Sequence, residues 1–218
     1  MNLSTPRGAL QKGVRFGNDL TIHVIRSSRG AGVVAEVLDG HRPALWVSDL
    51  YGAQHGHAEA WQVCLAHQLR DCTYAIEAGD AVFAPRMKAL LLRAVVLARR
   101  HRNLAPSTRR EYRRRLECAL DAVMALAPRH RDGQCLRKRY GKLRPHLFTF
   151  LDYPELPADN NGSGTATYRK VTGGFRSTWG ADLFAGVRSI IGTAARRSVG
   201  AYQAIQQTLR GQATTYPG

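Results

Sequence analysis

One carboxylate of this sequence stands where an α/β protein usually carries its chemistry. Asp49 closely follows the apolar run of residues 43–47, which is typical of a buried strand. Open α/β sheets bind ligands at the carboxyl ends of their strands, so Asp49 is a candidate metal ligand and catalytic residue. The alternative is structural, because an Asp at this point also caps the turn over residues 48–52.

A cysteine and a histidine follow at the spacing Cys-x-x-His. Cys64 and His67 fall where an expected short strand passes into a helix. Two ligands do not make a zinc site, and recruiting His55, His57 and Cys72 would need a geometry that the spacing does not suggest. We therefore expect His67 to orient a neighbouring site or simply to be packed and hydrogen-bonded.

A polar loop and a basic stretch form the third group of candidates. The loop holds Asp159, Asn160 and Asn161, and by itself it is typical of an ordinary turn. The stretch over residues 168–177 has two adjacent glycines and three cations that are candidate DNA contacts: Arg169, Lys170 and Arg176. A glycine-hinged basic loop can approach phosphates closely, although this one fits no Walker or dinucleotide fingerprint.

Positive charge is concentrated in the middle of the chain. Between Arg86 and Arg144 there are 18 Lys or Arg residues against four acids, an excess of +14 within a formal net charge of +16. A polyanion binder needs such a density, because each neutralised phosphate releases condensed counterions. We interpret the segment as DNA-binding, in preference to a solvated face that merely keeps the protein soluble. The first candidate contacts are four clustered arginines: Arg109, Arg110, Arg113 and Arg114.

The elements that must position these residues begin with a mixed α/β pattern. Apolar residues alternate over 20–24 as in a half-buried strand, and residues 30–38 form an apolar helical face before the buried strand. A connection of about 17 residues suffices for a right-handed crossover, so the pattern predicts a parallel βαβ unit. A third short strand is expected over 61–65. Residues 1–19 show no strand pattern.

From residue 81 onward the apolar period changes to 3.6, which is typical of amphipathic helices. Three basic helices are expected up to residue 151. Thr108 and Glu111 predict a capping box at the start of the second, and Pro145 should kink or split the third. After a loop, we expect a long amphipathic helix and then a shorter one over 200–209. Asp182 lies at the start of the long helix, where it either substitutes for a catalytic acid or interacts with the helix dipole.

The order of these features resembles the bacterial transposases of the insertion-sequence-66 family. The shared features are Asp49 closing a strand, the Cys64 and His67 pair, a helical insertion, the Asp159-Asn160-Asn161 loop, and Arg169-Lys170 before a long helix. The resemblance implies an α/β fold with a partial RNase H-like core, Mg²⁺-dependent DNA cleavage and strand transfer, and transposon ends as the partner. It assigns the second catalytic Asp of the family to Asp49, which would hold metal.

The sequence departs from this family at the other two catalytic acids. Where the family continues the Asp-Asn-Asn loop with Glu-Arg, this chain has residues 164–167, Gly-Thr-Ala-Thr, and no Glu follows Glu155. Residues 1–19 offer no strand for the first catalytic Asp, so we expect a truncated chain that lacks the N-terminal DNA-binding region. The prediction is a transposase-like DNA-binding protein with impaired catalysis. The alternative is a non-enzymatic basic nucleic-acid-binding module.

The expected organisation has five segments: a non-core N-terminal segment (1–19), an RNase H-like α/β part (20–80), a basic helical insertion (81–151), a C-terminal loop and helices that complete the core (152–210), and a tail (211–218).

The chain shows no signal-peptide core and no apolar run of membrane-spanning length, which predicts a soluble, cytoplasmic protein. Four irregularly spaced cysteines predict reduced thiols. The sequence leaves open a homo-oligomer on DNA.

Overall fold

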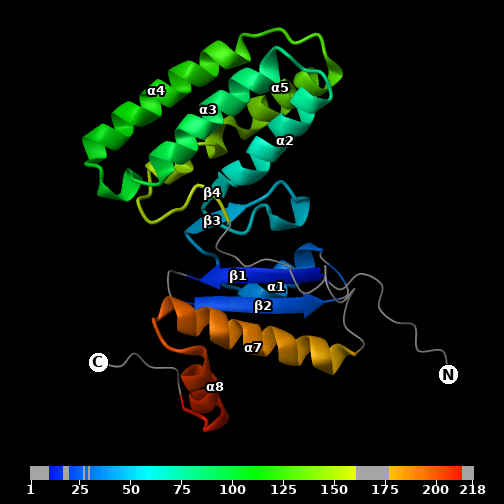
Figure 1. The fold of residues 1–218 in the computed structure, drawn as a ribbon, viewed down its shortest axis with the longest axis vertical. Helices are drawn as coiled ribbons and strands as arrows, with labels where there is room; N and C mark the ends of the chain where they lie inside the picture. Colours follow the sequence, from blue (N-terminus) through cyan, green and yellow to red (C-terminus); the bar gives the residue numbers. More distant parts are fainter. Residues whose placement is uncertain (1–9, 17–19, 27, 29, 161–176, 213–218) are drawn as a thin grey trace, which may run out of the picture. The chain divides into compact units, whose positions relative to one another are not determined.

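The computed structural model of the chain describes residues 10–16, 20–26, 28, 30–160 and 177–212 (Figure 1). The chain divides into two compact units. Unit 1 comprises Met1–Gly40 and Asn161–Gly218, and unit 2 comprises His41–Asn160. Unit 2 therefore contains the whole of the expected helical insertion, 81–151, and residues 41–80 of the expected α/β part.

Unit 1 is built on an antiparallel pair of strands. β1 (Leu10–Phe16) pairs with β2 (Leu20–Arg26). The alternation over 20–24 correctly predicts β2, but the expectation that residues 1–19 contain no strand is wrong. Lys12 interrupts the apolar alternation of β1, and Gly13 has a low strand propensity, so its pairing with β2 and not its local pattern makes this segment a strand.

The free edge of β2 is covered by a helix. Unit 1 contains α1 (Ala31–Leu38), α7 (Thr178–Arg196) and α8 (Ala201–Leu209), and α7 lies along β2 on the side away from β1 (Figure 1). Thr193 Oγ1 accepts the N–H of Thr21 at 3.1 Å and donates to its carbonyl at 3.2 Å. Ser189 Oγ accepts the N–H of His23 at 2.8 Å. These hydroxyls satisfy backbone groups that an uncovered edge would leave open to another strand.

Unit 2 begins with a short parallel sheet. β3 (Leu45–Ser48) pairs with β4 (Ala60–Val63), and the connection between them contains a 3₁₀ turn, η1 (Gly52–Gln54). The strand expected over 61–65 is thereby confirmed. The predicted βαβ pairing is wrong, because the parallel partner of β3 is β4, while β2 pairs with β1. The connection between β3 and β4 is long enough for the chain to turn back and place β4 parallel to β3. β2 is therefore not required as the parallel partner of β3.

Four helices form the rest of unit 2: α2 (Leu65–Glu77), α3 (Phe83–Ala98), α4 (Pro106–Met124) and α5 (Arg131–Leu143). Short 3₁₀ turns, η2 (His101–Asn103), η3 (Arg144–His146) and η4 (Thr149–Leu151), connect and follow them. α3 packs against α2, α4 and α5, and its buried residues recur at the helical period. The expected amphipathic helices of this segment are therefore confirmed, and α5 ends before Pro145 as expected.

The N-termini of α3 and α4 are capped differently from what local sequence patterns predict. Asp80 is almost fully buried and caps α3, since its carboxylate accepts the N–H of Ala84 at 2.7 Å and that of Phe83 at 3.4 Å. The capping box expected from Thr108 and Glu111 is wrong. α4 begins earlier, with a proline at its first position, and Glu111 bonds instead to arginines one turn further on.

The fold class is mixed α/β and mostly helical, with the two-stranded pairs β1–β2 and β3–β4. The expected α/β class is thus confirmed at this coarse level. Among the described residues, no helix is both long enough and apolar enough to cross a membrane.

Candidate functional site

The carboxyl ends of β3 and β4 bring the candidate residues of unit 2 to one place. Cys64 directly follows β4, and its N–H donates to the carbonyl of Ser48, the last residue of β3, at 2.7 Å. The N–H of Leu65 donates to the carbonyl of Ala158 at 2.9 Å, which brings the predicted polar loop to the start of α2. We call five residues the strand-end cluster: Ser48, Asp49, Cys64, Asp159 and Asn160.

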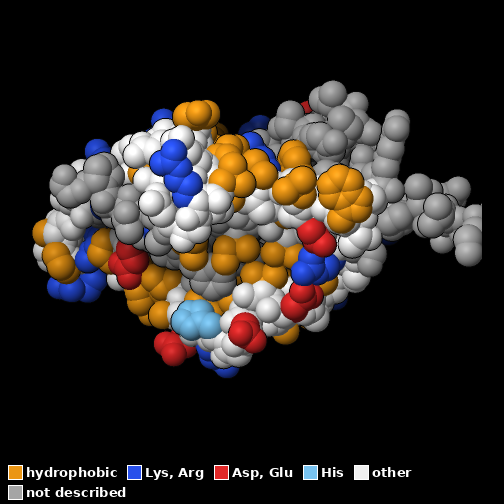
Figure 2. Space-filling model, turned by 90° about the horizontal axis from the view of Figure 1, so that it is seen from below, with side chains coloured by type: hydrophobic (Ala, Val, Ile, Leu, Met, Phe, Trp, Pro, Cys, Tyr) orange, Lys and Arg blue, Asp and Glu red, His pale blue; other side chains and the backbone are white. Residues whose placement is uncertain are grey.

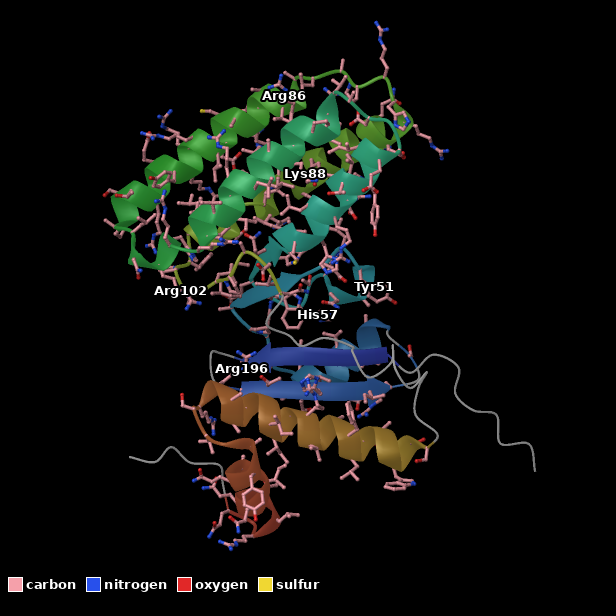
Figure 3. All side chains as sticks on the ribbon, viewed as in Figure 1. Tyr51, His57, Arg86, Lys88, Arg102 and Arg196 are labelled. Carbon is pink, nitrogen blue, oxygen red and sulfur yellow. The ribbon has the colours of Figure 1, made fainter. Side chains whose placement is uncertain are left out.

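Asp49 is half-buried in this cluster, and its side chain stabilises a turn. Its Oδ1 accepts the N–H of Tyr51 at 3.0 Å. Tyr51 and His57 both belong to the β3–β4 connection (Figure 3). The turn-capping alternative for Asp49 is therefore present in the structure. In the part of the chain that the structure describes, no three His, Cys, Asp or Glu side chains gather to hold a metal ion.

Cys64 and Asn160 are in direct contact although they lie 96 positions apart in the sequence. The Cys64 thiol donates to Asn160 Oδ1 at 3.0 Å, and the Asn160 N–H points back to the sulfur at 3.4 Å. Burial raises the pKa of the Cys64 thiol, and the N–H of Asn160 acts in the opposite direction. A protonated thiol is consistent with its role as a donor, so this cysteine holds the polar loop against the sheet.

The remaining candidates are divided between the two units. His67 is half-buried in the first turn of α2, where its backbone N–H faces the Cys64 sulfur. Asp182 lies in unit 1, exposed on α7, and forms an ion pair with Arg26 at 3.2 Å. The other predicted residues fall outside the described ranges: Asn161, Arg169, Lys170 and Arg176.

The basic residues of unit 2 fall into two classes. Of the 18 cations between Arg86 and Arg144, five form ion pairs: Arg113, Arg114, Arg115, Arg139 and Arg144. The other thirteen have no ion pair among the residues that the structure describes. Figure 3 shows Arg86 and Lys88 near the start of α3 and Arg102 beyond its other end, so the cations extend along this helix. Most of the positive charge is therefore free to bind an anion.

The four arginines predicted on α4 separate in the same way. Arg113 forms an ion pair with Asp152 and also points to the Phe148 carbonyl, so it fastens α4 to the segment that follows α5. Arg114 is paired with Glu111 at 2.9 Å, and its hydrogen bonds, together with that of Arg115, lower the pKa of the Glu111 carboxyl to about 2. Arg109 and Arg110 have no such partners in the described chain and are the better anion contacts.

A comparison with protein families identifies the chain at the family level. It matches the profile of the Transposase IS66 family over residues 9–183. The chain belongs to this family. No curated protein and no solved structure matches it. The matched range includes the strand-end cluster and the basic helices of this IS66-family transposase chain.

Sequence reasoning missed a group of tilted ring contacts beside the strand-end cluster of the IS66-family chain. The Trp61 ring lies 4.5 Å from that of His55 and 4.8 Å from that of His146, measured between centroids. Trp61 Nε1 donates to Ser48 Oγ at 2.9 Å, which ties the rings to the end of β3. His146 follows α5, and no local pattern links it to the β3–β4 connection. Burial lowers the pKa of His146, and nearby His55 adds to this effect.

Proposed function

We propose that this chain is a DNA-binding protein of the transposition machinery, and that the cations between Arg86 and Arg144 that lack an ion pair in the described chain are its main DNA contacts. The observation that carries the proposal is that thirteen of the 18 basic residues between Arg86 and Arg144 lack a carboxylate partner among the described residues. Unpaired guanidinium groups neutralise phosphates without first breaking an ion pair. Family membership supports DNA as the polyanion.

The experiment measures the affinity for duplex DNA by fluorescence anisotropy across a salt series. Six contacted phosphates would produce a log–log slope of about −5. We expect Arg109→Glu/Arg110→Glu to weaken binding at least about tenfold on every duplex, because phosphate contacts carry no base information. The matched control is Arg70→Glu/Arg210→Glu, which changes the net charge equally at two exposed arginines outside α3 and α4. A flat salt dependence, or equal losses in both variants, contradicts the proposal.

We further propose that this chain alone does not cleave or join DNA. Two-metal phosphoryl transfer needs several carboxylates around ions about 4 Å apart. Asp49 is engaged by Tyr51, and no set of three potential ligands gathers in the described residues, so the residues present do not fit a pair of Mg²⁺ ions. Binding of one Mg²⁺ through Asp49 should be weak, because a hard cation with one carboxylate keeps most of its water.

This part is tested with a cleavage and strand-transfer assay on transposon-end DNA in Mg²⁺ or Mn²⁺. We expect no product above the level without protein. Metal-dependent cleavage that disappears in Asp49→Ala would overturn the proposal, and Asp182→Ala would then test the substitute acid. Removing a single group that stabilises developing charge costs enzymes about 10²- to 10³-fold, so a genuine activity would be visibly lost.

The second candidate function is a basic nucleic-acid-binding module with no place in transposition. The strand-end cluster favours the first proposal, since the contact between Cys64 and Asn160 joins two motifs that resemble those of the family. An RNase H-like core would explain why they converge. Preference for transposon ends over unrelated duplexes of the same length separates the two proposed functions, because a general nucleic-acid-binding module binds both kinds of duplex alike.

Sedimentation of the complex with DNA tests whether the chain forms a homo-oligomer on DNA.

A further inference from the structure

We propose that a groove between α3 and α4 binds an acidic, amphipathic α-helix of a partner protein. The groove has a volume of about 400 Å³ and opens to solvent. Its apolar wall is formed by Leu92 and Val96 of α3. Its rim carries Arg93 of α3, Arg100 just beyond the end of α3, and Arg115 of α4. We call this feature the α3–α4 groove.

The apolar wall is unusually exposed for aliphatic side chains on a packed helix. Leu92 is 47% and Val96 58% exposed, and they lie one helical turn apart. The floor below them is closed by Leu97 and Leu116, which are almost fully buried. Isolated exposed aliphatic residues are ordinary, but a pair that borders a hollow with an apolar floor forms a continuous surface that a second apolar face can cover.

The rim determines the charge of the partner. Arg93 and Arg100 are exposed and have no ion pair among the described residues. Arg100 and Arg115 both lie over the ring of Tyr112, at 5.9 and 6.0 Å from its centroid. These contacts hold the two guanidinium groups at the groove. Arg115 is also paired with Glu111 at 2.8 Å, so Arg93 and Arg100 are the rim cations without an ion pair in the described chain. Apolar side chains flanked by Asp or Glu complement this arrangement.

Other occupants fit less well. Duplex DNA gains nothing from the aliphatic wall, and the guanidinium groups over Tyr112 compete with a base for its ring. A second copy of the chain brings a net charge of +16 against a basic rim. The residues outside the described ranges contain a single acid, Asp19, so they do not supply the complementary charge either. A separate acidic protein remains the best match.

A helix is the appropriate shape because the groove runs between two packed helices. Helix-in-groove recognition uses apolar anchors at positions i, i+3 or i+4, and i+7 of the bound helix. Leu92 and Val96 offer two contact points with the corresponding spacing along α3. Carboxylates beside the anchors of the partner would then reach Arg93 and Arg100.

The test uses a labelled 18-residue helical peptide with Leu at i, i+3, i+7 and i+10 and Glu at the flanking positions. Two matched probes replace every Leu by Ser, or every Glu by Lys. Fluorescence anisotropy with the full chain should show the acidic leucine peptide binding at least about tenfold more tightly than either probe. Val96→Gln should weaken that binding about tenfold, whereas Tyr74→Gln, at an equally exposed apolar position on α2, should leave it unchanged.

Two results would overturn the proposal. Equal binding of the serine and leucine peptides would mean that the rim attracts any polyanion without use of the groove. If Val96→Gln leaves peptide binding intact but weakens duplex DNA binding, the α3–α4 groove binds DNA and not an acidic helix. Circular dichroism of both variants establishes that they are folded before either result is read. Since DNA and peptide affinities are measured separately, failure of this proposal is distinct from failure of DNA binding.

Discussion

The two units are stabilised by different kinds of contact. Unit 2 has a core of large side chains, in which Phe83, Tyr140 and Phe148 are fully buried. Unit 1 has no fully buried aromatic side chain among its described residues: it buries a few aliphatic residues such as Ile25 and Leu38, and α7 meets β2 through small residues such as Ala185 and Thr193. The close approach lets hydroxyl groups satisfy the edge of β2, but it removes little apolar surface from water. Unit 2 should therefore respond most to lost volume, and unit 1 to added volume and lost hydrogen bonds.

The two units also differ in what they leave exposed. In the view of Figure 2, hydrophobic side chains gather on one face of unit 1. The exposed large residues on α7 and α8 are Trp179, Leu183, Tyr202 and Leu209. Unit 2 instead carries most of the cations of the chain. The contrast supports the proposal that the DNA contacts belong to unit 2.

The largest expected effect is loss of volume in unit 2. Leu120 of α4 is fully buried, so Leu120→Ala should lower the free energy of unfolding by about 3 kcal/mol, through lost burial and the cavity left behind. Hydrogen exchange should accelerate in α3 and α4 and remain unchanged in α7. Leu183→Ala, at an exposed position of unit 1, is the control. Acceleration in both units would show that they unfold together and would break the comparison.

Added volume should harm unit 1 where α7 meets β2. A Cβ at Gly192 would lie 3.1 Å from the Thr21 side chain, whereas one at Gly186 meets nothing within 4 Å. Gly192→Val should cost about 2 kcal/mol by overpacking and by helix propensity. Gly186→Ala should stabilise the helix by up to about 1 kcal/mol. Denaturant titration monitored by hydrogen exchange in α7 checks both, and a neutral Gly192→Val would mean that the contact is loose.

The hydroxyl of Thr193 is the next test of unit 1. Thr193→Val keeps the volume but removes both bonds to the Thr21 backbone and leaves a buried N–H without its acceptor. We expect a loss of about 1–2 kcal/mol. Thr193→Ser retains the hydroxyl and should recover most of it. If the two variants are equally stable, the edge of β2 does not depend on this side chain.

The smallest effect concerns pH and unit 2. The pKa of His146 is lowered in the folded state, so the unfolded chain binds a proton that the folded chain resists. Stability contributed by neutral His146 is present above its ordinary pKa of about 6.5 and is lost as pH falls below that value. His146→Gln should flatten this dependence in Trp-fluorescence melts from pH 8 to 5. The variant His23→Gln, which removes a similarly lowered pKa in unit 1, separates the contributions of the two units.

Local patterns predicted the helices well and their capping less well. The 3.6-residue period over α3 arises from residues that are close in sequence, and Pro145 ends α5 through its own ring and missing N–H. The predicted start of α4 is wrong, because Thr108 and Glu111 match a capping box in spacing while the helix already runs through them. A cap signal identifies candidate starts, and the backbone at the preceding residues decides among them.

The candidate site was predictable only as separate pieces. Asp49, Cys64 and Asn160 were each singled out by type and position, yet nothing local indicates that the thiol of Cys64 meets the amide of Asn160 across 96 positions. The same holds for the role of Arg113, which pairs with Asp152, while Arg109, one helical turn earlier, has no such partner in the described chain. Such assignments depend on which surfaces pack together.

By itself, the sequence determined the charge of the middle segment, the helical periods and the positions of the polar loops, since each depends on composition or on neighbours within two turns. Only the tertiary structure decided that β3 pairs with β4 and β2 with β1, and that five arginines are consumed by ion pairs. Strand pairing and ion pairing join residues far apart in the chain. The energies of strand pairing and ion pairing depend on packing that brings those residues within a few ångströms of each other. A periodic pattern along the sequence does not indicate which distant residues come that close.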